Sequence, residues 1–266
     1  MVPLVDMHCH LLAGVDDGPR RDADALDMCR IACAEGVSVA VALAHQKGRW
    51  NSVTVDRVRH AASLLAQRLR ASAVPLTTYA GAEVMLHPEI ESTWLHGEVL
   101  SIADRRQYLL LAMSPDPRID AQILIPALIA AGARPILAQP ERDEKFLNEP
   151  DLLERLVRVG CLVQVCSASI TDPPGRAEGR MLKGWMKRGL VHLLGSNGHS
   201  PSTRPPLMSA AYRQVTRWVG RTEADRIGSS NGMAVVQGLP LRISEPEAAT
   251  SRWTPKLWWS RRQSSN

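Results

Sequence analysis

The chain has 266 residues, of which 45% are hydrophobic and 22% are charged, and its formal net charge at pH 7 is +5. This length and composition favour one large α/β domain and do not require a second. The five cysteines lack paired spacing, which argues against a disulfide framework or a zinc ribbon and favours a reducing cytoplasm. A modest positive charge spread along the chain does not indicate a nucleic-acid groove.

Insertion into a membrane is not expected, because no apolar stretch approaches the length of a span and no basic segment precedes an apolar one at the N-terminus. The last residues, 241–266, are unusual in combining tryptophans with arginine and lysine. We therefore expect one domain over residues 1–240, followed by a poorly ordered tail that can touch an anionic membrane surface or a partner.

Apolar, β-rich runs alternate with helical patterns along most of the chain, which is typical of repeated βα units. The expected strands are Val2–His8, Ser38–Ala44, Leu76–Val84, Gln107–Met113, Arg134–Ala138, Cys161–Val165 and Val191–Ser196. The expected helices are Asp22–Glu35, Val55–Ala71, Ala121–Ala131, Glu149–Val159, Gly175–Arg188, Leu207–Val219 and Arg221–Ile227. Several of these helices end in glycine, which suits a left-handed cap. Seven such strands predict a closed or nearly closed α/β barrel, one unit short of the usual eight.

Polar side chains follow the expected strands directly, where the active sites of α/β barrels lie. His8 and His10 end the first strand, and both imidazoles reach one point because residues i and i+2 of a strand face the same way. His45 follows the second strand and Glu83 ends the third. The segments after the fifth and seventh strands are Gln139-Pro140-Glu141-Arg142 and Asn197-Gly198-His199. The pattern predicts a metal site at the carboxyl ends of the strands.

This ordered series of motifs resembles the PHP superfamily (polymerase and histidinol phosphatase). Within that superfamily, the chain is most similar to the bacterial manganese-dependent tyrosine phosphatases of capsule and exopolysaccharide loci, the CpsB/CapC type, from about Met1 to Gly238. The resemblance is carried by His8-x-His10, Asp16-Asp17-Gly18, His45 with Gly48-Arg49-Trp50, Gly81-Ala82-Glu83-Val84, Gln139-Pro140-Glu141-Arg142 and Gly195-Ser196-Asn197-Gly198-His199. It implies a distorted (β/α)7 barrel and a phosphatase that acts on the tyrosine kinase of polysaccharide export.

The same resemblance implies the ligands of up to three divalent metals. His8, His10 and Glu83 would hold one metal, with Glu83 bridging to a second, whereas Asp17, His45 and His199 would hold a third. Arg142 and Arg204 match arginines that contact the phosphoryl group in that family.

Departures from the family pattern fall on ligand positions. Gln139 stands where the family has a metal-binding histidine, and Asn197 stands where it has an aspartate. The segment His45-Gln46 keeps one of two histidines, and residues 109–113 lack the glutamate of the family's fourth strand. Amide oxygens are neutral and are poor ligands for a hard cation. We therefore expect Asn197 to be only a weak ligand, and one or two Mn²⁺ ions rather than three.

The expected reaction is metal-assisted hydrolysis, in which an activated water attacks phosphorus in line. Arg142 and Arg204 would neutralise the phosphoryl oxygens, and His199 or His45 would serve the leaving group. A cysteine mechanism is not expected, because no cysteine precedes an arginine by six positions. Cys9 is expected in the core, and the remaining histidines are expected at the surface or in packing contacts: His60, His87, His96 and His192.

Two other functions remain open from the sequence. The substitutions at Gln139 and Asn197 favour a catalytically reduced domain that binds a phosphorylated partner without turnover. A histidine pair at the end of a first strand is also shared by small-molecule phosphoesterases and amidohydrolase-like barrels. The two arginines favour a phosphoryl substrate over an amide.

Overall fold

The computed structural model describes residues 2–149 and 151–241. The tail expected over residues 241–266 therefore lies outside the described residues, except for Leu241, which packs against the apolar interior of the barrel. None of the described helices is both long and apolar enough to cross a bilayer.

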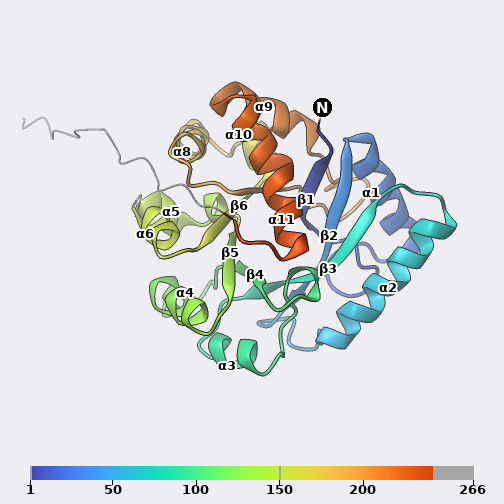
Figure 1. The fold of residues 1–266 in the computed structure, drawn as a ribbon, viewed down its shortest axis with the longest axis horizontal. Coiled ribbons are helices and arrows are strands. Elements are labelled where there is room, and N and C mark those ends of the chain that lie inside the picture. The colour runs from blue at the N-terminus through green and yellow to red at the C-terminus, as the bar shows by residue number, and fades with distance from the viewer. Residues whose placement is uncertain (1, 150, 242–266) are drawn as a thin grey trace, which may run out of the picture.

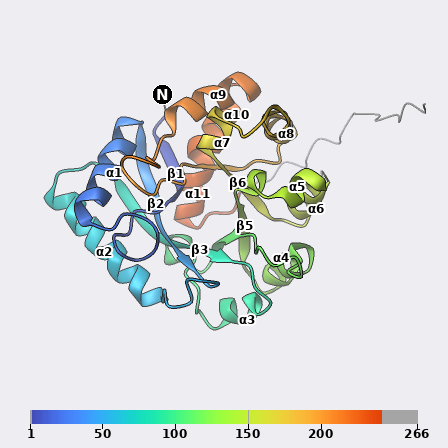
Figure 2. The same cartoon turned by 180° about the vertical axis from the view of Figure 1, so that it is seen from behind.

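Seven parallel strands, adjacent in chain order, form a barrel (Figures 1 and 2). They are β1 (Leu4–Cys9), β2 (Val37–Gln46), β3 (Thr77–Met85), β4 (Tyr108–Ala112), β5 (Arg134–Ala138), β6 (Leu162–Cys166) and β7 (Leu193–Gly195). The ring closes between β1 and the segment after β7. There the N–H of Asn197 donates to the carbonyl of His8 at 2.7 Å, and the N–H of His10 donates to the carbonyl of Gly198 at 2.9 Å. The predicted seven-stranded barrel is confirmed, with strand ends that shift by one or two residues.

Apart from the last helix, which lies across one end, the helices surround the barrel on its outer face (Figure 1). They are α1 (Asp22–Ala34), α2 (Val55–Ala71), α3 (Ile90–Leu95), α4 (Ala121–Ala130), α5 (Glu144–Asn148), α6 (Leu152–Arg158), α7 (Ser167–Thr171), α8 (Arg176–Lys187), α9 (Ser209–Val219), α10 (Arg221–Asp225) and α11 (Asn231–Gln237). The sequence did not predict α3, α5, α7 and α11, because helices of five to seven residues depend on tertiary packing rather than on their own pattern. The expected helix Arg221–Ile227 is also different, since α10 continues through a π-helical turn, Arg226–Ser230, into α11.

Two apolar layers stabilise the barrel. Along β2, Val39, Val41 and Leu43 face the barrel interior, whereas the alternating alanines face the helices, as the two-residue period of a strand requires. One end of the barrel is covered by α11, which crosses it in Figure 1 and adds Val235 and Val236 to the interior cluster. The end of the barrel at which the strands begin is thus filled with apolar side chains. Polar side chains gather at the opposite end, where the strands finish.

Candidate metal centre

His8 and His10 lie together at the end of β1. Their Nε2 atoms are 3.2 Å apart, and both side chains are fully buried. Glu83 reaches the same point from β3, with its Oε2 atom 3.5 Å from Nε2 of His8 and 3.6 Å from Nε2 of His10. The structure therefore brings together the first predicted set, and its donor atoms converge as a metal site requires.

Two further side chains fix the direction of these imidazoles. Gln164, on β6, accepts a hydrogen bond from Nδ1 of His8 at 2.9 Å, and Asp16 accepts one from Nδ1 of His10 at 2.7 Å. With the Nδ1 atoms occupied, each ring presents Nε2 to Glu83, which is the usual orientation of a metal-binding histidine. Neither Gln164 nor Asp16 is predicted from the sequence to position a ligand. Asp16 could have been found as one of two adjacent aspartates close to the histidine pair. Gln164 could not, because it lies inside an otherwise apolar strand.

A second group gathers beside the first and shares His10 with it. It contains His10, Asp17, His45 and His199, each of which offers a ligand atom within 4.8 Å of the others. The Oδ1 atom of Asp17 lies 3.3 Å from Nε2 of His45 and 3.5 Å from Nε2 of His199. His45 also points its Nδ1 atom at Oε2 of Glu83, 3.0 Å away, so the Glu83 carboxylate lies between the two groups. Asp17, His45 and His199 are the second predicted ligand set, and the structure adds His10 to it.

The histidines and carboxylates of this cluster shift one another's pKa values. Burial alone would raise the pKa of Glu83, but the neighbouring histidines hold that pKa well below its usual range. Burial would lower the pKa of His10, yet its hydrogen bonds to Asp16 and Glu83 raise it to about 9. Burial and the charges of His10 and Arg204 lower the pKa of His199 to about 3. These shifts follow from the close mutual contacts of the histidines and carboxylates, and metal ligation would require each of these histidines in its neutral form.

Gln139 and Asn197 form a hydrogen-bonded amide pair at the edge of the cluster. The Nδ2 atom of Asn197 donates to Oε1 of Gln139 at 2.7 Å, and Arg142 donates to the same oxygen at 3.2 Å. Both residues have left-handed backbone, with φ of 49° at Gln139 and 55° at Asn197. Since Gln139 uses its amide oxygen in these two bonds, it is not a free ligand for a cation.

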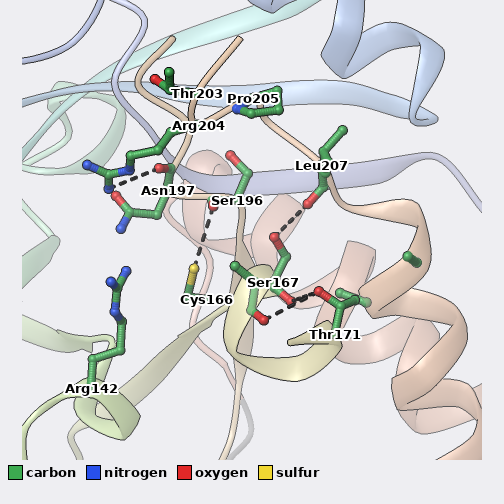
Figure 3. A pocket seen from close by; sticks show the side chains of 13 residues that line it. Arg142, Cys166, Ser167, Thr171, Ser196, Asn197, Thr203, Arg204, Pro205 and Leu207 are labelled. Atoms are coloured by element: carbon green, nitrogen blue, oxygen red, sulfur yellow. Dashed lines mark hydrogen bonds between the residues drawn. The ribbon is translucent and has the colours of Figure 1, made fainter. Parts of the chain in front are cut away.

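Arg142 and Arg204 lie on the same side of a neighbouring recess (Figure 3). Arg204 donates to the carbonyl of Asn197 at 3.3 Å, and that carbonyl also accepts the Nδ1 hydrogen of His199 at 3.0 Å. Burial and the nearby charge of Arg142 lower the pKa of Arg204. Two guanidinium groups that repel each other beside a histidine and carboxylate cluster are suited to bind an anion.

The other histidines and the cysteines agree with expectation. His60 and His96 are exposed, His87 is half-buried and His192 is buried in a packing position. Cys9 is buried in the core, and its thiol approaches the carbonyl of Gly198 at 3.8 Å.

The fold and this cluster define the class of the protein, which is an α/β barrel with histidines and carboxylates gathered at the carboxyl ends of its strands. A family model described as capsular polysaccharide synthesis, CpsB/CapC, matches residues 4–237. The chain belongs to this family.

Individual relatives agree with that assignment. The tyrosine-protein phosphatase YwqE of Bacillus subtilis is 30% identical over 203 residues, covering 76% of this chain and 79% of YwqE. The tyrosine-protein phosphatase CpsB of Streptococcus pneumoniae is 21% identical over 238 residues, covering 88% of this chain and 98% of CpsB.

Solved structures show the same fold. A chain from the crystal structures of YwqE from B. subtilis and CpsB from S. pneumoniae matches this protein with a TM-score of 0.85 and 26% identity. The match covers 91% of this chain and 98% of the other, and those structures are described as metal-dependent tyrosine phosphatases. A dihydropyrimidinase from Brevibacillus agri matches with a TM-score of 0.52 and 10% identity, covering 90% of this chain and 71% of that one. This second likeness reflects the barrel fold alone.

Proposed function

We propose that this protein is a metal-dependent protein-tyrosine phosphatase of capsule or exopolysaccharide synthesis, acting in the cytoplasm on the tyrosine kinase of polysaccharide export. The observation that carries the proposal is the convergence of two histidine and carboxylate groups beside Arg142 and Arg204. Relatives that bear the name tyrosine-protein phosphatase support the reaction.

The residues present fit a divalent cation. The buried Nε2 atoms of His8 and His10 face a carboxylate, and their Nδ1 atoms are held by Asp16 and Gln164. His8, His10 and Glu83 would hold one ion, and Asp17, His45 and His199 would hold another, with Asn197 at most a weak further ligand. Imidazole together with carboxylate suits Mn²⁺, which we propose as the metal. When bound, such ions supply Lewis-acid activation of water and of the phosphoryl group.

The chain's own side chains would bind and orient the substrate. Arg142 and Arg204 would pair with the phosphoryl oxygens and neutralise the charge that develops on them. His199, whose Nδ1 hydrogen is held by the carbonyl of Asn197, keeps its Nε2 atom directed at Asp17 beside the same anion position. The phenolate of tyrosine takes up one proton as it leaves, but His199, with its pKa lowered to about 3 and its Nδ1 hydrogen held by Asn197, has no second ring proton to give, so its role would be to hold the ion.

The amide pair Gln139–Asn197 favours a second candidate, a domain that binds a phosphorylated partner without turnover. The pair offers neutral groups at the edge of the cluster, and Gln139 has no free amide oxygen. A domain with fewer bound cations would keep the two arginines and still bind a phosphoryl group. A different metal-dependent phosphoesterase activity is the third candidate, since the arginines select a phosphoryl group but not its ester.

A hydrolysis assay tests the proposal. We expect the purified protein with Mn²⁺ to release phosphate from a phosphotyrosine peptide between neutral and alkaline pH, and to stop when the metal is chelated. Arg204→Gln should lower kcat/KM about 30- to 150-fold, because a charge-assisted hydrogen bond contributes about 2 to 3 kcal/mol. Arg70→Gln, an exposed position on α2, is the matched control. Tight binding of the peptide with no phosphate release would support the second candidate instead.

A further inference from the structure

An apolar recess of about 250 Å³ opens beside Arg142 and Arg204 (Figure 3). Two of its polar side chains are engaged with backbone carbonyls: the Ser167 hydroxyl donates to Leu207 at 2.5 Å, and the Cys166 thiol approaches Ser196 at 3.6 Å. The remaining lining is largely carbon, and Leu207 is 48% exposed at its edge. The recess therefore suits an apolar group that is attached to an anion.

This recess adjoins two other hollows, with which it shares lining residues. It shares Asn197 and Arg204 with the hollow of about 380 Å³ that contains the metal cluster. It shares Thr171 and Ala210 with a shallow depression on α9. The three hollows are thus neighbours in the order cluster, apolar recess and α9 surface, and we call this row of hollows the trough.

The α9 end of the trough is positively charged. The helix presents Ala210, Arg213, Gln214 and Arg217 to the depression, and the i, i+3, i+4, i+7 spacing places them on one face. Within residues 2–149 and 151–241, no carboxylate lies within 4.0 Å of Arg213, Arg217, Arg142 or Arg204, although the charge of Arg213 contributes to the lowered pKa of Glu35. Arg221 and Arg226, just after α9, are by contrast paired with Asp225 and Glu223.

We propose that this trough binds an acidic polypeptide segment that carries the phosphotyrosine. The aromatic ring occupies the recess, the phosphoryl group lies between the arginine pair and the cluster, and acidic side chains next to the tyrosine contact Arg213 and Arg217. The hollows follow the order of groups in phosphotyrosine. The phosphoryl group lies at the tip of the side chain, the ring comes next, and the backbone with its neighbouring residues comes last. This inference rests on the proposed function and names the sequence context of its substrate.

Two phosphotyrosine peptides that differ only in flanking glutamate or glutamine test the charged end. We expect the protein to prefer the glutamate peptide by about tenfold in Kd, measured by fluorescence anisotropy, and in kcat/KM. The preference should shrink as ionic strength rises. The double variant R213Q/R217Q should abolish the preference, and R70Q should retain it. No preference in the unsubstituted protein, or a preference that survives R213Q/R217Q, overturns the proposal, as does an oligonucleotide that competes better than the glutamate peptide.

A filling variant tests the recess. Ala168 lines the recess at an exposed position, so Ala168→Trp should fill it and weaken the affinity for both peptides about tenfold. Ala177→Trp, at an exposed position of α8 outside the trough, should leave both affinities unchanged. Equal affinities of Ala168→Trp and the unsubstituted protein would contradict a ring in the recess. If neither peptide is hydrolysed, the proposed function fails, whereas the anisotropy measurements still decide this inference.

Discussion

Asp16 holds His10 in place: its carboxylate accepts the Nδ1 hydrogen of the imidazole at 2.7 Å, and both side chains are buried. The same carboxylate accepts the backbone N–H of His45 at 2.9 Å and that of Gly18 at 3.0 Å. One acidic side chain thus fixes the ring that belongs to both ligand groups and also the backbone of a second histidine. The balance of burial and these bonds lowers the pKa of Asp16 to about 2, so it remains charged at neutral pH.

The first prediction concerns this positioning role. Asp16→Asn removes the charge and one acceptor oxygen, so it should weaken Mn²⁺ binding about 10- to 100-fold without unfolding the protein. Titration calorimetry with Mn²⁺ measures the affinity, and circular dichroism checks the fold. The matched control is Asp27→Asn, an exposed aspartate on α1 whose side chain pairs with Arg30. An affinity equal to that of the control would contradict the role assigned to Asp16.

The second prediction concerns the amide pair. Gln139→His together with Asn197→Asp replaces two neutral groups by an imidazole and a carboxylate, which are better ligands for a hard cation. We expect the double variant to retain about one more metal ion per chain, measured by elemental analysis after dialysis, and to hydrolyse phosphotyrosine faster. The double alanine variant at these two positions breaks the pair and adds no ligand, so it should gain no metal. Equal metal content in the two double variants would show that these positions do not face a cation.

The barrel, and the end of it that carries the candidate metal site, could be predicted from the sequence. Strand composition and the polar residues at strand ends can both be recognised from short stretches of sequence. His8, His10, His45, Glu83 and His199 each lie at or just after the carboxyl end of a recognisable strand, so parallel pairing gathers them. Gln164 could not be assigned in the same way, because within β6 it looks like an ordinary residue of a buried strand. Its contact with His8 spans 156 positions and depends on the closed register of the barrel.

The third prediction concerns close packing beside His8. A Cβ atom at Gly195 would lie 2.5 Å from Cβ of His8 and 2.7 Å from Nε2 of Gln164. Gly195→Ala should therefore destabilise the protein by about 1 to 3 kcal/mol and lower its melting temperature. Gly184 in α8 has no atom within 4 Å of the equivalent position, so Gly184→Ala should instead stabilise by about 0.5 to 1 kcal/mol. Thermal unfolding of the two variants should thus shift in opposite directions, and a shared direction would contradict the packing argument.

The fourth prediction concerns His192, which lies outside the site. Its Nδ1 atom accepts the N–H of Val163 at 3.0 Å, so the ring is neutral in the folded protein. Burial and the charge of Arg226 lower its pKa to about 4. The unfolded chain takes up this proton near pH 6.5, so the contribution to stability is complete above pH 6.5 and is lost as the pH falls towards 4.

The free energy of unfolding that His192 contributes, and that is lost between pH 6.5 and 4, amounts to about 3 kcal/mol. His192→Asn keeps an acceptor for Val163 but does not titrate, so its free energy of unfolding should fall less steeply between pH 6.5 and 4 than that of the unsubstituted protein. Denaturant unfolding at several pH values measures the difference, with the exposed His60→Asn as control. Because acidic groups elsewhere titrate equally in all three proteins, only the difference in slope counts. Parallel pH profiles for His192→Asn and the unsubstituted protein would mean that His192 takes up its proton equally readily in the folded state.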